Sequence, residues 1–324
     1  MTAPIKERRH MSLKIKKAAA GFLFFALTAA GLLSLAAGCG ARKVGKASVK
    51  REDLTVTIPG MTKEVKLFFL SDLHITTLND QISEADRDTV KGRVEWSSLN
   101  GVPSERLLDD WVGYINASSA DYVLFGADLL DCCAKKNADI LKAGLDKLKK
   151  PYMYIRADHD SKPYYLSGVS DEDCLGYQEG ICDNSDVMTE DFGDFLVVGW
   201  NNSTENITEE GLRIFKDACK AGKPIILLTH VPIEPVGDDS LTKASKEVFD
   251  GRVLLWGLGE SYYFADDNTV ELLNMIYAED SPVKEILCGH LHFSWDGPVT
   301  DTVHEHVFSQ AFGGFGGIVT VKGE

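Results

Sequence analysis

The chain has 324 residues, 44% of them hydrophobic and 26% charged, which is enough to bury a sizeable core in one large domain or two small ones. Its formal net charge is −15, and residues 1–38 carry six basic side chains against one acidic, so the remainder is still more acidic. We therefore do not expect nucleic acid as a partner, although an acidic surface does not exclude small phosphate esters at a site that binds cations.

Residues 1–39 differ in composition from the rest of the chain. The six basic side chains precede an uncharged, apolar run at 18–38, an order typical of an export signal. The run leads into L-A-A-G-C at Cys39, which resembles the lipobox of bacterial lipoproteins, except that the leucine lies one place further upstream. We predict a signal segment with a lipidated Cys39, and the alternatives are an uncleaved membrane anchor and a buried helix.

The lipoprotein and the anchor both place the rest of the chain on the extracytoplasmic face of the cell membrane, because basic residues favour the inner side. The membrane is then a partner through the N-terminal segment. Residues 40–52 are predicted to form a short tether, and residues 53–324 a single domain.

Strands and helices alternate along this domain. Apolar runs predict strands at Val65–Leu70, Tyr122–Phe125, 152–155, 195–200, Ile225–Leu228 and 286–288, with short ones at 303–308 and 317–321. Apolar positions at helical spacing predict helices at Ser104–Ala117, 138–148, 209–219, 241–249 and 269–277. No element is predicted for the polar stretches 76–101 and 161–190. The alternation implies a layered α/β fold, in which ligands bind outside the carboxyl ends of strands.

Side chains suited to binding metals follow five of these strands. In chain order they are D-L-H at Asp72 and His74, A-D-L-L-D with Asp128, D-H-D at Asp158, His159 and Asp160, T-H with His230, and G-H-L-H at His290 and His292. A single such piece is usually incidental, whereas five in succession after strands point to one metal site at the edge of a sheet. The i, i+2 spacings would direct both side chains of a pair the same way in an extended segment, and Asp128 is free to bridge two cations.

Together the five pieces resemble the motifs of the calcineurin-like metallophosphoesterase superfamily, which are D-x-H, G-D-x-x-D, G-N-H-D/E, a lone histidine and G-H-x-H. The resemblance covers about residues 65–293. It implies a four-layer βα-sandwich, with two mixed sheets flanked by helices, and a centre of two metal ions of the Mn, Fe or Zn type. One ion would be held by Asp72, His74 and His292, the other by Asp158, His230 and His290, with Asp128 bridging.

The same resemblance implies a phosphoesterase that hydrolyses a small phosphate-ester substrate with hydroxide activated by the dinuclear centre. It makes His159 the candidate general acid, oriented by Asp160 or a nearby carboxylate, and the alternative is a further metal ligand or a structural histidine. Arg156 matches an arginine of the protein-phosphatase branches and would bind phosphate oxygens, unless it forms a salt bridge at the strand end. Asp131 closes the second motif and is expected to support a ligand rather than to be one.

Three positions depart from the motifs. Asp158 stands where the superfamily has asparagine, and Ala127 and Ala157 stand where it has glycine. Glycine serves where φ is positive or where segments approach closely, so alanine indicates either an ordinary backbone or a small shift. These departures keep a second hypothesis open, namely a surface protein of the same fold that binds a metal or another ligand with little turnover.

Other chemistry-bearing residues lie outside these motifs. Six cysteines follow Cys39, and Cys174 and Cys182 are the best candidates for a disulfide, with reduced thiols as the alternative. His304 and His306 share the i, i+2 spacing but match no motif, so a solvated strand is expected there. The aromatic residues Tyr164, Tyr165, Tyr177 and 262–264 lie between motifs and form either a cap over the leaving group or local packing.

Overall fold

The computed structural model describes residues 49–324 except 184, 203–205 and 260. The predicted signal segment 1–39 and most of the tether lie outside the described residues. Val44–Glu324 forms one compact unit, which holds all of the elements below. Within the described part, no helix has both the length and the apolar composition needed to cross a membrane.

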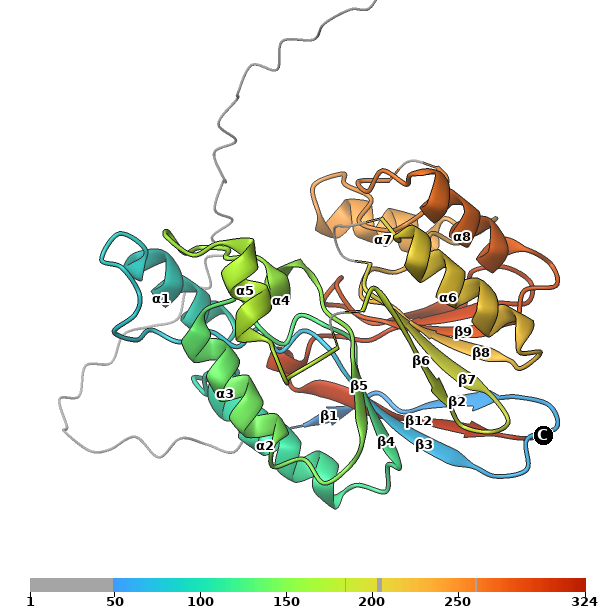
Figure 1. The fold of residues 1–324 in the computed structure, drawn as a ribbon, viewed down its shortest axis with the longest axis horizontal. Coiled ribbons are helices and arrows are strands. Elements are labelled where there is room, and N and C mark those ends of the chain that lie inside the picture. The colour runs from blue at the N-terminus through green and yellow to red at the C-terminus, as the bar shows by residue number, and fades with distance from the viewer. Residues whose placement is uncertain (1–48, 184, 203–205, 260) are drawn as a thin grey trace, which may run out of the picture. The chain divides into compact units, whose positions relative to one another are not determined.

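Two mixed sheets of six strands form the centre of this unit (Figure 1). In sheet order, the first contains β1 (Lys50–Arg51), β12 (Phe315–Lys322), β3 (Val65–Leu70), β4 (Tyr122–Phe125) and β5 (Tyr152–Tyr154), and β2 (Leu54–Thr57) also pairs with β12. The second contains β10 (Trp295–Pro298), β11 (His304–Val307), β9 (Val283–Cys288), β8 (Ile225–Leu228), β7 (Leu196–Trp200) and β6 (Val187–Asp191). The strands β3, β4 and β5 are parallel neighbours, as are β7, β8 and β9.

Helices cover the outer faces of both sheets. They are α1 (Arg87–Trp96), α2 (Ser104–Ala117), α3 (Lys135–Leu145), α4 (Asp158–Ser161), α5 (Asp171–Tyr177), α6 (Glu209–Lys220), α7 (Ser240–Val248) and α8 (Asp267–Tyr277), with a short 3₁₀ helix at Ala311–Gly313. Figure 1 shows α2 and α3 beside the first sheet, and α6 and α8 beside the second. The predicted four-layer sandwich is therefore confirmed.

The alternation of side chains in β3 explains the layering. Leu67 and Phe69 enter the core between the sheets, whereas Phe68 and Leu70 pack under α2 and α3. All four side chains are almost completely buried. Burying one such side chain contributes roughly 1.5–3 kcal/mol, so each face of the strand is held by its own core.

Two helices lie within the stretches for which no element was predicted. The helix α1 buries only Val90, so it lacks the apolar stripe by which a helix is recognised in a sequence. The helix α5 begins at a capping box, in which Ser170 and Asp173 bond to each other's backbone, and it is only seven residues long. The edge strands β6 and β10 were also missed, and the helix predicted at 138–148 spans Lys135–Leu145.

The predicted disulfide between Cys174 and Cys182 is wrong. All six cysteines that the structure describes are free thiols. Cys174 lies beside Cys133 instead, and the two Sγ atoms contact each other's backbone carbonyl oxygens at 3.3 and 3.5 Å. Cys182 instead donates to the side chain of Gln178 at 3.4 Å.

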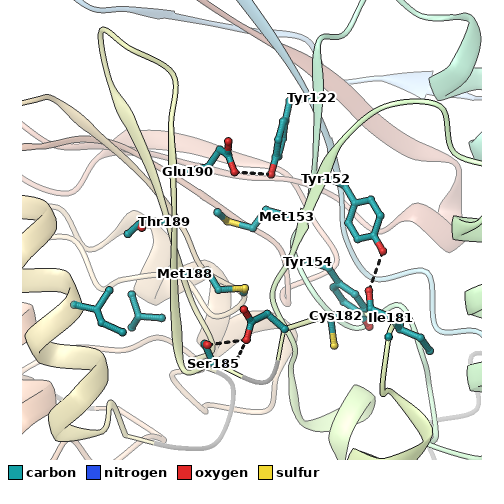
Figure 2. A pocket seen from close by; sticks show the side chains of 14 residues that line it. Tyr122, Tyr152, Met153, Tyr154, Ile181, Cys182, Ser185, Met188, Thr189 and Glu190 are labelled. Carbon is teal, nitrogen blue, oxygen red and sulfur yellow. Dashed lines mark hydrogen bonds between the residues drawn. The ribbon is translucent and has the colours of Figure 1, made fainter.

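A cavity of about 600 Å³ opens between the edge strands β5 and β6 (Figure 2). Met153 and Met188 extend toward each other across it, and the hydroxyl of Tyr122 donates to Glu190 beside them. Its described lining contains none of the residues predicted to bind metal. The chemistry suggested by the motifs therefore lies elsewhere, at the carboxyl ends of the strands.

The buried carboxyl group of Glu305 on β11 should make folding depend on pH. Burial raises its pKa from an ordinary 4.5 to about 8, although Oε1 accepts from the backbone N–H of Ile233 at 2.9 Å. A raised folded-state pKa contributes stability that is complete below pH 4.5 and is lost as pH rises through 8. Glu305→Gln should therefore raise the free energy of unfolding by on the order of 2 kcal/mol more at pH 9 than at pH 5.

Chemical denaturation at the two pH values measures this difference. Glu271→Gln on the exposed face of α8 is the matched control, and it should change stability little at either pH. An equal effect of Glu305→Gln at pH 5 and pH 9 would contradict the prediction.

Candidate metal centre

The five predicted pieces meet at one edge of the two sheets. Asp72 follows β3, and its Oδ1 lies 3.2 Å from Nε2 of His292, which follows β9 in the other sheet. The same oxygen lies 3.8 Å from Nε2 of His74 and 4.0 Å from Nε2 of His230. Ligand-type atoms from both sheets thus converge on one carboxylate, as the strand-end pattern predicted.

The turns that carry these side chains are left-handed and not extended. The φ angles are 57° at Asp72, 50° at His74, 49° at Asp128, 70° at His290 and 56° at His292. Non-glycine residues rarely adopt this region, and such strain gathers at functional sites. The expected extended geometry of the i, i+2 pairs is therefore wrong, although the side chains still converge.

Buried neighbours and backbone hydrogen bonds hold the strained turns. Leu73 and Leu291, the middle residues of the two pairs, are buried in separate cores. The backbone N–H of Asp72 donates to Ala127 O at 3.0 Å, and that of His74 donates to Asp128 O at 2.9 Å. The loops after β3 and β4 thus continue to pair beyond the strands, which fixes Asp72 and Asp128 relative to each other.

Two clusters of potential ligand atoms share Asp72. Among the described residues, one contains Asp72, His74 and His292, and the other contains Asp72, Asp128 and His230. Oδ2 of Asp128 lies 3.1 Å from Nε2 of His230 and 3.7 Å from Nε2 of His74, so this carboxylate reaches both clusters.

Asp158 and His290 lie near these clusters but belong to neither. Oδ2 of Asp158 accepts from the hydroxyl of Tyr164 at 2.8 Å, and Nε2 of His290 lies 3.0 Å from the hydroxyl of Tyr263. The rings of His290 and His230 are 5.0 Å apart. A tyrosine hydroxyl thus contacts each of the two predicted ligands, Asp158 and His290, that lie outside the clusters.

The donor set fits bound cations. Oδ1 of Asp72 and Oδ1 of Asp128 are buried, and neither accepts a hydrogen bond from any described residue. Leaving such an oxygen unsatisfied costs roughly 1–3 kcal/mol, and more when it is charged. His74 donates from Nδ1 to Asp131 at 2.9 Å and His230 from Nδ1 to Gly126 O at 2.8 Å, so in both rings Nε2 faces the carboxylates.

The charges of the aspartates and histidines in the two clusters also fit bound cations. Burial by itself raises the pKa of Asp72, but His292 and His74 hold it well below its usual range. Burial lowers the pKa of His74, yet the hydrogen bond with Asp131 and the nearby carboxylates of Asp72 and Asp128 raise it to about 10. The pKa of His230 is also raised to about 10, chiefly by Asp128 and against the effect of burial. Imidazolium groups therefore balance the carboxylates. Metal cations that bind to these histidines must displace the extra protons from the imidazole rings.

A third cluster, which contains His74, Asp131 and His159, has a different role. The carboxylate of Asp131 accepts from His74 and, at 2.8 Å, from Nε of Arg93, so its oxygens are already satisfied. Nδ1 of His159 lies 2.6 Å from the carbonyl oxygen of Asp131. Asp131 thus orients two imidazoles, in agreement with the supporting role expected for it.

Of the two alternatives for orienting His159, Asp160 or a nearby carboxylate, the structure favours the second, because His159 contacts Asp131 and not Asp160. The carboxylate of Asp160 is fully buried and accepts from the backbone N–H groups of Asp128 at 2.8 Å, Leu130 at 3.0 Å and Ala157 at 2.9 Å. It also accepts from the hydroxyl of Tyr154 at 2.6 Å. Asp160 therefore holds the loop of Asp128, and Asp131 takes over the orientation of His159.

Two further supports of the site were not assigned a role from the sequence. Arg93 lies on α1, which has no apolar stripe, so nothing linked it to Asp131. Oδ1 of Asn202 accepts from the backbone N–H groups of His230 and Val231, both at 2.9 Å. Its position directly after β7 was the available signal, because the next strand along the sheet leads to His230.

The two motif alanines have different backbones. Ala127 has a φ of 73°, so it adopts the left-handed conformation that a glycine would adopt without strain. Ala157 has a φ of −124° and is extended, so glycine is not required there. Ala127 therefore keeps the backbone conformation expected of the motif glycine, at a cost in strain. The backbone at Ala157 is one that any residue adopts.

Other candidates lie outside the clusters. The backbone N–H of Arg156 donates to Oδ1 of Asn201 at 2.7 Å, and its binding of phosphate stays a prediction. His304 and His306 are not simply solvated, because they lie 3.2 Å from Glu285 and 2.9 Å from Asp296, respectively.

Replacing Asp160 with asparagine should loosen the loop of Asp128. An amide accepts at only one of its two ends, so at least one of the four donors loses its partner. We expect Asp160→Asn to lower stability by about 1–3 kcal/mol and Mn²⁺ affinity by about 10- to 100-fold. Denaturation and calorimetric titration measure the two effects. Asp171→Asn, at an exposed position of α5, is the control, and an unchanged Mn²⁺ affinity of Asp160→Asn would contradict the prediction.

The chain matches one protein-family model and is similar to several solved structures. The family model described as calcineurin-like phosphoesterase matches residues 65–294. Among solved structures, the chain is similar to a dimetal phosphatase from Danio rerio, with 12% identity over 76% of this chain and 88% of that chain and a TM-score of 0.46. It is also similar to a purple acid phosphatase from yellow lupin seeds, with 12% identity over 80% of this chain and 45% of that chain and a TM-score of 0.47.

A search of curated proteins found no match. The family match covers more than half of the chain, and its boundaries enclose every buried aspartate and histidine of the two clusters. The chain belongs to the calcineurin-like phosphoesterase family.

Proposed function

We propose that this metallophosphoesterase hydrolyses a small phosphate ester in a dinuclear metal centre, on the extracytoplasmic face of a membrane. One observation carries the catalytic part of the proposal. Two buried aspartates from the first sheet present unsatisfied oxygens to imidazole nitrogens from both sheets. Such a donor set suits ions of the Mn, Fe or Zn type.

The residues divide between two cations. Asp72, His74 and His292 would hold one, and His230 would hold the other with Asp158 and His290 completing the set. Asp128 would bridge, because its carboxylate reaches histidines of both clusters. When bound, the cations supply Lewis acidity to a phosphoryl oxygen and lower the pKa of water.

His159 is placed to protonate the leaving group. Its Nδ1 donates to the carbonyl oxygen of Asp131, which leaves Nε2 to hold the proton that is transferred. Its ring is 4.9 Å from the ring of His74, so it lies directly beside the proposed ligands. As the bond from phosphorus to the ester oxygen breaks, the proton on His159 neutralises that oxygen.

The full chain in detergent, stripped by a chelator and reloaded with Mn²⁺, Zn²⁺ or Fe²⁺, tests the proposal. Saturable hydrolysis of phosphate esters that requires the metal supports it. Tight loading of metal without turnover on mono- and diesters would instead favour a surface protein that binds a metal or ligand. The separation of Asp158 and His290 from the clusters is the observation that favours this alternative.

If His159 is the general acid, its replacement should matter most for poor leaving groups. We expect His159→Gln to lower kcat for an alkyl phosphate by about 10²- to 10⁴-fold. Hydrolysis of nitrophenyl phosphate should fall much less, because its leaving group departs without a proton. Steady-state kinetics on the two esters measures the difference. His304→Gln, outside the clusters, is the control, and equal losses on both esters would exclude the acid role.

The membrane tether rests on the sequence of residues 1–39, where basic side chains, an apolar run and L-A-A-G-C lead to Cys39. If Cys39 is lipidated, a bacterial host that expresses the full chain should attach a clickable palmitate analogue to it. Cys39→Ser should abolish this label, which is read by in-gel fluorescence. Cys219→Ser, at a half-buried position of α6, should retain it. A wild-type chain that stays in the membrane without label would show an uncleaved anchor instead.

A further inference from the structure

A continuous line of aromatic side chains borders the proposed metal ligands. It begins at Tyr164, whose ring centroid is 5.0 Å from that of His159, and continues to Tyr165 at 6.1 Å from Tyr164. The guanidinium carbon of Arg93 then lies 4.9 Å from the ring of Tyr165 and 3.9 Å from the ring of Trp96.

Phe312 closes the line at 4.5 Å from Trp96. We call Tyr164, Tyr165, Trp96 and Phe312 the aromatic border.

The border touches the ligands as well as the candidate acid. The ring centroid of Trp96 is 5.2 Å from that of His74 and 5.6 Å from that of His292. Phe312 lies 5.7 Å from His74 and 5.3 Å from His292. The border therefore runs beside both His159 and the ligands of one proposed cation, so a leaving group next to His159 is within reach of its rings.

Two of these rings face solvent. Trp96 is 41% exposed and Tyr164 is 36% exposed, although both belong to a well-packed domain. Together with the neighbouring rings of the border, these two side chains offer aromatic area that a ligand at the site can cover.

The border is also held in place before any ligand binds. The hydroxyl of Tyr164 donates to Asp158, which fixes its ring relative to a proposed metal ligand. The guanidinium of Arg93, one helical turn before Trp96, lies over the Trp96 ring and is also bonded to Asp131. Preorganised rings lose little conformational freedom when a ligand stacks on them.

We propose that the aromatic border binds the leaving group of the substrate, and that this group is a planar aromatic ring attached directly to the ester oxygen. The inference rests on the proposed hydrolysis. In the reaction, water adds to phosphorus, the bond from phosphorus to the aryl oxygen breaks, and the proton on His159 passes to the departing oxygen. We infer direct attachment from the short distances, because the ring centroid of Trp96 lies 5.2 Å from that of His74 and that of Tyr164 lies 5.0 Å from that of His159.

Binding of two non-hydrolysable anions by the full Mn²⁺-loaded chain tests the border without turnover. Calorimetry should give a Kd for phenylphosphonate that is about three- to tenfold lower than that for methylphosphonate, the range expected for one aromatic contact. Trp96→Ala should remove this preference by weakening the binding of phenylphosphonate more than that of methylphosphonate. Trp96→Phe should keep part of it, which shows that a ring is needed and that the variants are folded.

Tyr114→Ala is the matched control, because the described ring contacts of Tyr114 are with Phe68 and Trp111. It should leave the preference intact. In kinetics, Trp96→Ala should raise KM for phenyl phosphate by a larger factor than KM for methyl phosphate.

The outcomes separate this inference from the proposed function. A wild-type chain that binds both phosphonates equally, or a preference that survives Trp96→Ala, overturns the inference even when esters are hydrolysed. A Trp96-dependent preference without any hydrolysis supports the aromatic site and removes the proposed turnover. If Trp96→Ala weakens the binding of adenosine monophosphate more than that of phenylphosphonate, direct attachment is overturned. In adenosine monophosphate the aromatic ring is separated from the phosphate by a ribose.

Discussion

The site depends on one constraint, which is that Asp72 and Asp128 are buried with too few hydrogen-bond donors around them. Each presents one oxygen that accepts no hydrogen bond from the described residues. A folded protein tolerates such oxygens only where cations or imidazolium groups balance their charge. The histidines that do so come from both sheets, so the centre exists only when the two sheets are packed together.

Supporting contacts, more than the ligands themselves, give this centre its shape. Asp160 collects three backbone N–H groups and thereby holds the loop of Asp128, while Asn202 does the same for His230. Asp131 orients His74 and His159 and is itself bonded to Arg93. Because Arg93 also stacks on Trp96, the metal ligands and the aromatic border share one support.

Several features could be predicted because they depend on local order along the chain. Strand ends followed by aspartate or histidine located Asp72, His74, Asp128, His230 and His292, since parallel strands bring their carboxyl ends to one edge. The layers followed from the alternation of strands and helices. The helix α1 could not be predicted, because it buries a single apolar side chain and is held by contacts of Arg93 and Trp96 that are distant in sequence.

The sequence by itself determined which residue types follow which strands, and hence the family, the layers and the chemistry of the ligands. Only the tertiary structure decided that the ligand turns are left-handed, that Asp160 supports Asp128, and that Asp158 and His290 are held by tyrosines. The physical reason is the range of the interactions. Side-chain periodicity acts between near neighbours, whereas strain, buried charge and hydrogen-bond partners are set by segments that meet only after folding.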